Sequence, residues 1–524
     1  MAATWRLRRA LPLLLCLVSM PGSFCDGRAR TPVQQAGQLD TGEEASALLE
    51  SVPGYLASVL CDGLFISDRT LASLLSSEGC LLGCALLPEL LATNALSYTV
   101  DGRRKSVTAR AGHVVVTATA PRDPSRQPFS CLVKTSAQVG PVVRPVYRSN
   151  GSPYRRFDWP EARGGTSSEF SGVDYGRLAA AIAPFFADPM APNSVANATE
   201  TRAVVVIYQG KIIAERYAES LGFFETTPLL GWSMGKSLTS ALVGLRIGDG
   251  ALNLTDLANP RAWSPAEVAE RNITVADLLH QTSGIRWNES SLPGSDANRV
   301  TFGLAQNDTE MFVVARPQAV PAGTRFDYST GNVQLLQGQL RRSFRGNDVA
   351  YWSYPYNRLF KPIGARSFKL SFDGVGTIQA SSSVYATARD WARLGQLYLQ
   401  DGVWDGTRIL PRGWVRYSRT PSSPSVRHVC GPVSLALGLC APYGALWWVA
   451  PLKGVSAAAY AAEGFEGQYV VVVPDQELVV VQLGWARNDA LDDYYAGVLV
   501  RHVSEAVPRG KSPRAKNTPG FSLP

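Results

Sequence analysis

A serine and a lysine lie three residues apart in the segment Ser233-Met234-Gly235-Lys236. On a helix this spacing places both side chains on one face, with Cβ atoms roughly 5–6 Å apart. A lysine that burial or a nearby positive charge keeps neutral can take the serine proton. No other lysine of the chain follows a serine at this spacing. The pair is a candidate nucleophile and general base, although S-x-x-K by itself also arises by chance.

The flanking sequence predicts a helix that begins at this serine. Residues 228–232 contain proline and glycine, as turns do, and apolar residues then recur at helical spacing from Leu238 to Leu245. Gly248-Asp249-Gly250 predicts the end of the helix. Ser233 would therefore lie at a helix N-terminus, where backbone N–H groups and the helix dipole favour developing negative charge.

Two further segments contain residues that suit acyl transfer. Tyr328 lies in the polar stretch 326–332 and could carry protons if a cation holds its phenol, although a surface tyrosine fits the same pattern. Residues 463–468 place two glycines before an apolar strand. Glycine lets a backbone N–H approach a ligand closely, as an oxyanion hole requires, but a plain hairpin or bulge fits equally well.

These segments together resemble the beta-lactamase-related serine hydrolases. Trp232–Lys236 is similar to the S-x-x-K element of that family, Leu278–Gly284 to its L-L-x-x-T-S-G segment, and Tyr328-Ser329 with Asn332 to its tyrosine motif. Residues 285–289, 443–448 and 464–468 resemble the 6-aminohexanoate-dimer hydrolase and family VIII carboxylesterase branch. The likeness runs from about Phe185 to Val503, with the motifs in the order of the family.

The resemblance implies a set of site residues. Ser233, Lys236 and Tyr328 would be catalytic, and the backbone N–H groups of Ser233 and Phe465 would form the oxyanion hole. The residues expected to contact the substrate are Asp296, Asn332, Gly464 and Trp448. An acid near the position of Asp296 accompanies amine-bearing substrates in the amide-hydrolase branch, but a loop acid without a role is equally compatible.

The chain departs from the family pattern at two positions. Thr330 stands where the class C beta-lactamases have the asparagine of Y-x-N. Ala462-Glu463-Gly464 replaces the K-T-G or H-x-G element, whose cation helps to bind the carboxylate of beta-lactams. The second departure argues against beta-lactamase activity, whereas an oxyanion hole built from backbone is less affected.

We therefore expect a serine hydrolase that cleaves a small-molecule amide or ester through an acyl-enzyme. An acyltransferase on the same fold is one alternative, and a catalytically inactive relative that serves in binding or assembly is another. No metal or organic cofactor is expected, because the histidines are dispersed and the cysteine spacing is not that of a zinc site.

The N-terminus predicts entry into the secretory pathway. Three arginines precede the apolar run Leu11–Met20, which is too short to span a membrane, so residues 1–25 are interpreted as a signal peptide. An Arg-rich mitochondrial presequence is the alternative. A secreted or lumenal protein, including a lysosomal or vacuolar one, also suits the sequons at Asn150, Asn197, Asn253, Asn272, Asn288 and Asn307.

Composition and cysteine usage agree with this compartment. The 524 residues are 45% apolar and 18% charged, enough for two or three domains, and no later stretch is apolar enough to cross a membrane. The formal net charge of +8 is scattered and forms no nucleic-acid patch. Disulfides of unknown connectivity are expected among Cys61, Cys80, Cys84, Cys131, Cys430 and Cys440.

The order of predicted elements indicates an α/β (α+β) fold. After the leader we expect a small N-terminal module at 26–155, a catalytic domain at 156–508 and a disordered basic tail at 509–524. Predicted hairpins at both ends of the catalytic domain, 203–217 and 469–483, would form one antiparallel sheet. Helices would flank that sheet, and a mostly helical lobe would be inserted between the hairpins, as in beta-lactamases and transpeptidases.

Overall fold

The computed structural model describes residues 41–77, 90–92, 94–123, 127–138, 141–154, 170–187, 194–290, 294–422, 441–486 and 489–508. Of residues 41–50, 76–77 and 489–492 it describes the backbone alone. The expected signal peptide and basic tail lie outside these residues, as do Cys80, Cys84, Cys430 and Cys440.

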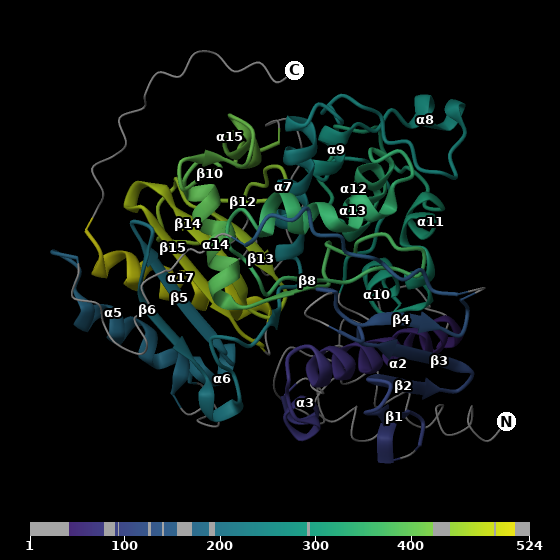
Figure 1. Cartoon of the computed structure of the whole chain (residues 1–524), viewed down its shortest axis with the longest axis horizontal. Helices are drawn as coiled ribbons and strands as arrows, with labels where there is room; N and C mark the ends of the chain where they lie inside the picture. The colour runs from purple at the N-terminus through teal and green to yellow at the C-terminus, as the bar shows by residue number, and fades with distance from the viewer. Residues whose placement is uncertain are drawn as a thin grey trace, which may run out of the picture.

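A six-stranded antiparallel sheet forms the centre of the predicted catalytic domain (Figure 1). Its spatial order is β12 (Trp448–Val449), β13 (Tyr460–Gly464), β14 (Gln468–Val473), β15 (Leu478–Leu483), β5 (Ala203–Tyr208) and β6 (Lys211–Tyr217). Strand β15 pairs with β5, so hairpins from opposite ends of the domain meet in one sheet. This confirms the predicted arrangement.

The turns of the two hairpins explain their sequences. Gln209 and Gly210 join β5 to β6 with positive φ angles of 49° and 79°, which suit the twist of a two-residue hairpin loop. Residues 474–477 join β14 to β15 through a short 3₁₀ turn (Pro474–Gln476) and Glu477 in the left-handed conformation. Both paired strands β5 and β15 are buried along their whole length, which accounts for their apolar sequences, interrupted only by Gln482 in β15.

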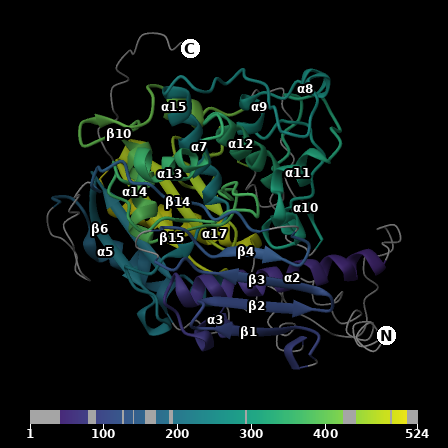
Figure 2. The same ribbon diagram turned by 45° about the vertical axis from the view of Figure 1, so that its right-hand side comes forward.

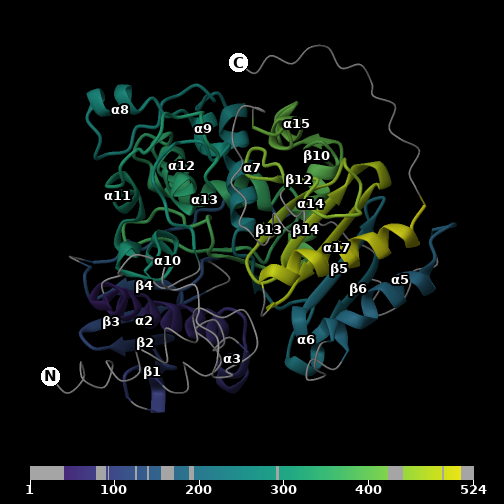
Figure 3. The ribbon, with the colours of Figure 1, turned by 180° about the vertical axis from the view of Figure 1, so that it is seen from behind.

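Helices cover both faces of the sheet. On one face α5 (Tyr175–Ile182), α6 (Val195–Thr199) and α17 (Asp489–Ala506) pack over residues such as Val204 and Val206. Figure 3 shows α17 crossing the strands on this side. On the other face α14 (Ala388–Leu399) lies against β14 and β15, while α7 (Met234–Gly248) lies against β13.

A mostly helical lobe lies between the hairpins in sequence, as predicted. It comprises α8 (Pro265–Arg271), α9 (Val275–Leu279), α10 (Asp296–Thr301), α11 (Thr309–Val314), α12 (Thr330–Arg342) and α13 (Asp348–Pro355), and α15 (Trp414–Ser418) follows later. Two small sheets accompany it: β7 (Leu229–Leu230), β9 (Val384–Ala386) and β8 (Lys369–Leu370), and the pair β10 (Val403–Trp404) and β11 (Thr407–Arg408). The catalytic domain thus has the expected α+β architecture.

The N-terminal module is a four-stranded antiparallel sheet with a long helix across it (Figure 2). Its elements are α2 (Thr41–Phe65), α3 (Leu71–Ser77), β1 (Ser97–Asp101), β2 (Ser106–Ala111), β3 (Val114–Thr119) and β4 (Leu132–Thr135). Leu56 and Leu60 of α2 form a separate apolar core with Val107 and Val116 of the strands. Residues 141–154 leave this module and run along the catalytic domain, where the N–H of Val143 donates to the carbonyl of Gly374.

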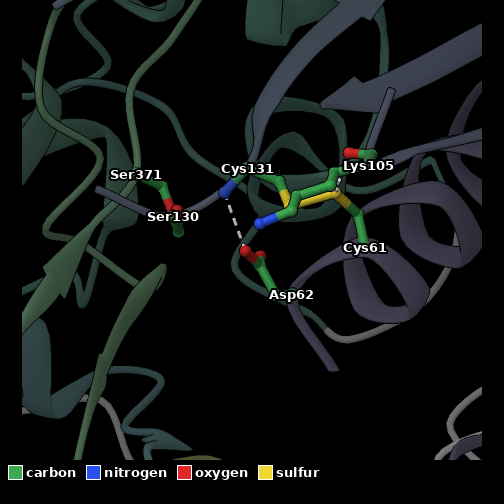
Figure 4. The surroundings of a disulfide bond; sticks show 6 residues. All are labelled: Cys61, Asp62, Lys105, Ser130, Cys131 and Ser371. Carbon is green, nitrogen blue, oxygen red and sulfur yellow. Dashed lines mark hydrogen bonds between the residues drawn. A yellow bond between two sulfur atoms is a disulfide. The ribbon is translucent and has the colours of Figure 1, made fainter. Parts of the chain in front are cut away.

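One disulfide, Cys61–Cys131, joins α2 to the segment that precedes β4 (Figure 4). The sequence alone leaves this pairing open.

Within the described ranges, no helix combines the length and the apolarity that a membrane crossing requires.

Candidate active site

The structure places Ser233 and Lys236 at the start of α7, as the sequence predicts. Ser233 is the N-terminal capping residue, but its side chain makes no capping bond. Its Oγ lies instead 2.9 Å from Nζ of Lys236, whose side chain is only 1% exposed. The helix continues to Gly248, and its apolar face is buried in the main core. Nucleophile and base candidates therefore lie within hydrogen-bonding distance on a rigid helix.

The turn before Ser233 depends on close backbone contacts. Trp232 has a positive φ of 46°, which is costly for a residue other than glycine and persists only where packing enforces it. A Cβ at Gly235 would lie 2.7 Å from the carbonyl oxygen of Ala380. Only glycine therefore lets the loop around Ala380 approach α7 and bring the Ser381 carbonyl to the lysine.

Three oxygen atoms surround Nζ of Lys236. They are Ser233 Oγ at 2.9 Å, Thr330 Oγ1 at 3.1 Å and the carbonyl oxygen of Ser381 at 3.0 Å. The Ser381 carbonyl can only accept a hydrogen bond, and the hydroxyl proton of Thr330 is donated to Glu289 Oε1 at 2.6 Å. A neutral lysine therefore directs its two N–H bonds at Thr330 and Ser381. Its lone pair is left facing Ser233.

Glu289 fixes this arrangement from the other side of Thr330. One carboxylate oxygen accepts the Thr330 hydroxyl, and the other accepts the Thr330 backbone N–H at 2.8 Å and the Trp287 indole N–H at 2.5 Å. The backbone N–H belongs to the first residue of α12, where the helix dipole favours a negative charge. Glu289 Oε1 also lies 3.7 Å from Nζ of Lys236.

Burial and Glu289 act on the lysine in opposite directions. Burial lowers the pKa of Lys236 below its ordinary value, because a desolvated ammonium is unfavourable. The negative charge of Glu289 and its hydrogen bonding raise the pKa again, but burial is the larger effect. The net effect lowers the pKa and so increases the share of the neutral amine, which is the form that can accept a proton.

Tyr328 is the third of the predicted catalytic residues, and its side chain lies beside the other two. Its ring stacks on Trp448, with centroids 5.6 Å apart, and meets Tyr443 edge-on at 5.7 Å. Nζ of Lys236 lies 4.8 Å from the ring centroid, and the hydroxyl interacts with Ser233. Burial and the charge of Glu289 raise the pKa of Tyr328, so its phenol stays protonated. Tyr328 is therefore suited to donate a proton, and Lys236 to accept one.

The glycine-rich segment 463–468 forms the tight turn between β13 and β14. Glu466 and Gly467 have positive φ angles of 61° and 85°, and Gln468 ties the turn by donating to the carbonyl of Glu466 at 2.9 Å. A Cβ at Gly464 would lie 2.3 Å from the carbonyl oxygen of Gly231. The turn therefore contacts the segment that precedes Ser233. It is a hairpin turn, and it also lies beside the candidate site.

Comparison with known proteins identifies the family. A model of the beta-lactamase family matches residues 186–496, more than half of the chain. The chain belongs to the beta-lactamase family. The 6-aminohexanoate-dimer hydrolase of Paenarthrobacter ureafaciens is 26% identical over 305 residues, which cover 56% of this chain and 74% of that protein.

Solved structures of beta-lactamase relatives are also similar to part of the chain. A 6-aminohexanoate-dimer hydrolase homologue from Bacillus anthracis has a TM-score of 0.48 at 19% identity and covers 62% of this chain and 86% of its own. A penicillin-binding protein homologue from Caulobacter crescentus has a TM-score of 0.48 at 15% identity, with coverages of 64% and 99%.

Other residues that the family resemblance suggested have partners within the protein. Asn332 is 2% exposed, and its Oδ1 accepts a hydrogen bond from Ser283 Oγ at 2.6 Å. It therefore joins the T-S-G segment to the tyrosine motif. Asp296 pairs with Arg316 at 3.1 Å and accepts the Asn288 N–H at 3.0 Å, so it holds the loop that carries Glu289. A substrate-binding role for either residue stays a prediction.

The sequence reasoning did not assign roles to Glu289, Thr330 and Ser381 at the lysine. Glu289 appeared there only within a segment that resembles one branch of the beta-lactamase family, and Thr330 only as a departure from Y-x-N. Nothing in the sequence marks Ser381, since a backbone carbonyl has no residue signal. Among the described residues no three His, Cys, Asp or Glu side chains gather in a way that could hold a metal ion.

The six sequons differ in accessibility. Asn150, Asn253, Asn272 and Asn288 are exposed, whereas Asn197 and Asn307 are half-buried. Asn307 also accepts a hydrogen bond from Thr135 Oγ1 at 2.7 Å, across the contact between the module and the catalytic domain. Glycosylation stays a prediction, and the exposed sites are the better candidates for it.

Proposed function

We propose that this member of the beta-lactamase family is a serine hydrolase that cleaves an amide or ester through an acyl-enzyme on Ser233. The observation that carries the proposal is the set of oxygen atoms around Nζ of Lys236, which leaves the lone pair of a neutral lysine facing Ser233 Oγ. The proposed hydrolase activity also agrees with the relative from Paenarthrobacter ureafaciens, a 6-aminohexanoate-dimer hydrolase.

The proposed reaction begins with transfer of the Ser233 hydroxyl proton to Nζ of Lys236. The oxygen forms a bond to the substrate carbonyl carbon, and the negative charge that develops on the carbonyl oxygen is bound by the N–H groups of Ser233 and Phe465. Lys236 and Tyr328 relay the proton to the leaving amine or alcohol as its bond to carbon breaks. Water then attacks the acyl-enzyme, restoring Ser233 and releasing the acid.

Transfer of the acyl group to an alcohol or amine is the second candidate reaction. It needs the same acyl-enzyme and differs only in the attacking nucleophile, so the residues around Ser233 are compatible with both. Product analysis with a competing alcohol or amine separates them. Retention of the complete Ser233, Lys236 and Tyr328 group argues against an inactive relative.

Labelling with a fluorophosphonate tests the proposed nucleophile. We expect the adduct on the peptide that contains Ser233, because Lys236 activates this serine, and we expect Ser233→Ala to take up no label. Mass spectrometry of the digested protein identifies the labelled peptide. Labelling of a different serine, with catalysis retained in Ser233→Ala, would falsify the mechanism.

The segment Ala462-Glu463-Gly464, which replaces the K-T-G or H-x-G element of the family, predicts which substrates are preferred. The methyl of Ala462 is buried in the core, and the carboxylate of Glu463 lies close enough to Tyr328 to raise its pKa. The uncharged Ala462 thus stands where the family has a cation, and the adjacent Glu463 adds a negative charge. A charge-assisted hydrogen bond contributes about 1.5–3 kcal/mol, so its loss lowers kcat/KM for a lactam carboxylate by roughly tenfold to a hundredfold.

The measurement compares a p-nitrophenyl short-chain ester, a linear amide, a chromogenic cephalosporin and the methyl ester of that cephalosporin on one preparation. We expect the simple ester or the linear amide to be preferred over the cephalosporin. Methylation of the lactam carboxylate should recover part of the difference, because it removes the unmatched charge. Preference for the free cephalosporin would show that another cation serves this carboxylate.

A further inference from the structure

Helix α2 of the N-terminal module packs against the strand that leads to the nucleophile. Ser67, just after α2, donates a hydrogen bond to the carbonyl oxygen of Pro228 at 2.9 Å, immediately before β7. Val59 of α2 belongs to the same apolar cluster as Trp232, and Leu230 of β7 packs against that cluster. The module therefore contacts the chain at both ends of the short stretch 228–232 that precedes Ser233.

Aromatic rings extend this contact to the proposed oxyanion hole. Tyr55 of α2 meets Phe302 edge-on at 5.0 Å, and Phe302 meets Trp232 at 5.9 Å. Trp232 in turn meets Phe465 at 5.7 Å. Trp232 precedes one of the two proposed oxyanion N–H groups, and Phe465 supplies the other. The row of rings from α2 therefore ends at the two residues that position the proposed oxyanion N–H groups.

A second series of contacts connects the disulfide (Figure 4) to β7, the strand that precedes Ser233. Cys61 of α2 is bonded to Cys131, whose backbone N–H donates to Asp62 at 2.8 Å. The adjacent Ser130 bonds to Ser371 through the two hydroxyls at 2.5 Å and to the carbonyl of Leu370 through its N–H at 3.1 Å. Leu370 ends β8, and β8 pairs with β9, which pairs with β7.

We infer that the N-terminal module is a positioning element of the active site, which holds the turn at Trp232 and the two oxyanion N–H groups in place through α2. The family match begins only at residue 186, so this support lies outside the matched domain. The positive φ of Trp232 needs such packing, because the conformation is unfavourable on its own. This inference rests on the proposed function of Ser233 and Phe465.

Two glycines of α2 provide a matched test. A Cβ at Gly54 would lie 1.7 Å from the backbone carbonyl oxygen of Phe302, so Gly54→Ala must push α2 and Phe302 apart. The atoms nearest to a Cβ at Gly63 would belong to the flexible side-chain end of Leu74, at 2.2 Å and inside the module. Both variants make the same chemical change on the same helix, but only Gly54→Ala disturbs the contact with the catalytic domain.

We expect Gly54→Ala to lower kcat for a p-nitrophenyl ester by about tenfold to a hundredfold with a smaller change in KM, since small displacements of catalytic groups have such costs. Gly63→Ala should keep the wild-type kcat. The rate of fluorophosphonate labelling of Ser233 should fall in parallel with kcat. Equal kcat in Gly54→Ala and wild type, or equal losses in both variants, would overturn the inference.

A second pair of variants covers the case in which Gly54→Ala does not fold. Tyr55→Leu removes the ring that contacts Phe302, whereas Tyr55→Phe keeps it. We expect kcat to fall in Tyr55→Leu and to stay near the wild-type value in Tyr55→Phe. Melting temperatures should be recorded for both variants. Unchanged kcat in Tyr55→Leu would also overturn the inference. Failure of the wild-type protein to label at Ser233 would instead refute the proposed function.

Discussion

Lys236→Arg is expected to lower kcat/KM by about two to four orders of magnitude, the range that general bases contribute. Arginine keeps the positive charge but does not release a proton in proteins, so it cannot accept the hydroxyl proton of Ser233. Hydrolysis of a p-nitrophenyl ester measures the loss. The lysine side chain is 1% exposed and has little room for a guanidinium, so Lys236→Met, which is uncharged and similar in length, serves as a second variant.

Lys361→Arg is the matched control for this experiment. Lys361 is also buried, at 4% exposure, but its Nζ contacts Ser149 and Asn150 and no residue of the candidate site. It should therefore keep the wild-type activity, and melting temperatures should show which variants are folded. Near-normal turnover in folded Lys236→Arg or Lys236→Met would rule out the lysine as the base.

Glu289→Gln should lower kcat and also shift the pH profile. A glutamine amide can donate to Thr330 Oγ1, which frees the threonine proton to compete with Ser233 for the lysine lone pair. Loss of a charge-assisted hydrogen bond worth about 1.5–3 kcal/mol corresponds to roughly a tenfold to hundredfold fall in kcat.

The direction of the pH shift follows from the charge of Glu289. The active form of Lys236 is deprotonated, so kcat/KM rises as the pH increases through the pKa of this lysine. Glu289 raises that pKa, so Glu289→Gln should move the rising limb to lower pH. A merely structural role would lower the plateau without moving the limb. That outcome, or an unchanged profile, would contradict the coupling.

Substitutions of Thr330 provide the control for Glu289. Thr330→Ser keeps the hydroxyl between Lys236 and Glu289 and should retain most activity. Thr330→Val removes the hydroxyl at nearly constant volume, leaves one lysine N–H without its acceptor, and should reduce kcat as Glu289→Gln does. Equal activity in the serine and valine variants would show that the hydroxyl has no part in orienting the lysine.

The sequence by itself determined the features that depend on near neighbours. Ser233 and Lys236 meet because helical spacing brings residues three apart onto one face, and this holds wherever the helix packs. The hairpins at 203–217 and 469–483 follow from apolar runs separated by turn residues, and the nearly continuous apolar sequence of β5 and β15 indicates burial on both faces. The α+β fold and the inserted helical lobe follow from the order of these elements.

Only the tertiary structure decided which groups surround the lysine and what supports the nucleophile. Thr330 and Ser381 lie 94 and 145 residues from Lys236 in the chain, and no local pattern specifies that the hydroxyl of one and the carbonyl of the other meet its Nζ. The Cys61–Cys131 pairing and the contact of Tyr55 with Phe302 likewise join distant segments. Such contacts depend on how whole elements pack, because long-range packing is set by the complementary shapes of buried surfaces and has no fixed period along the sequence.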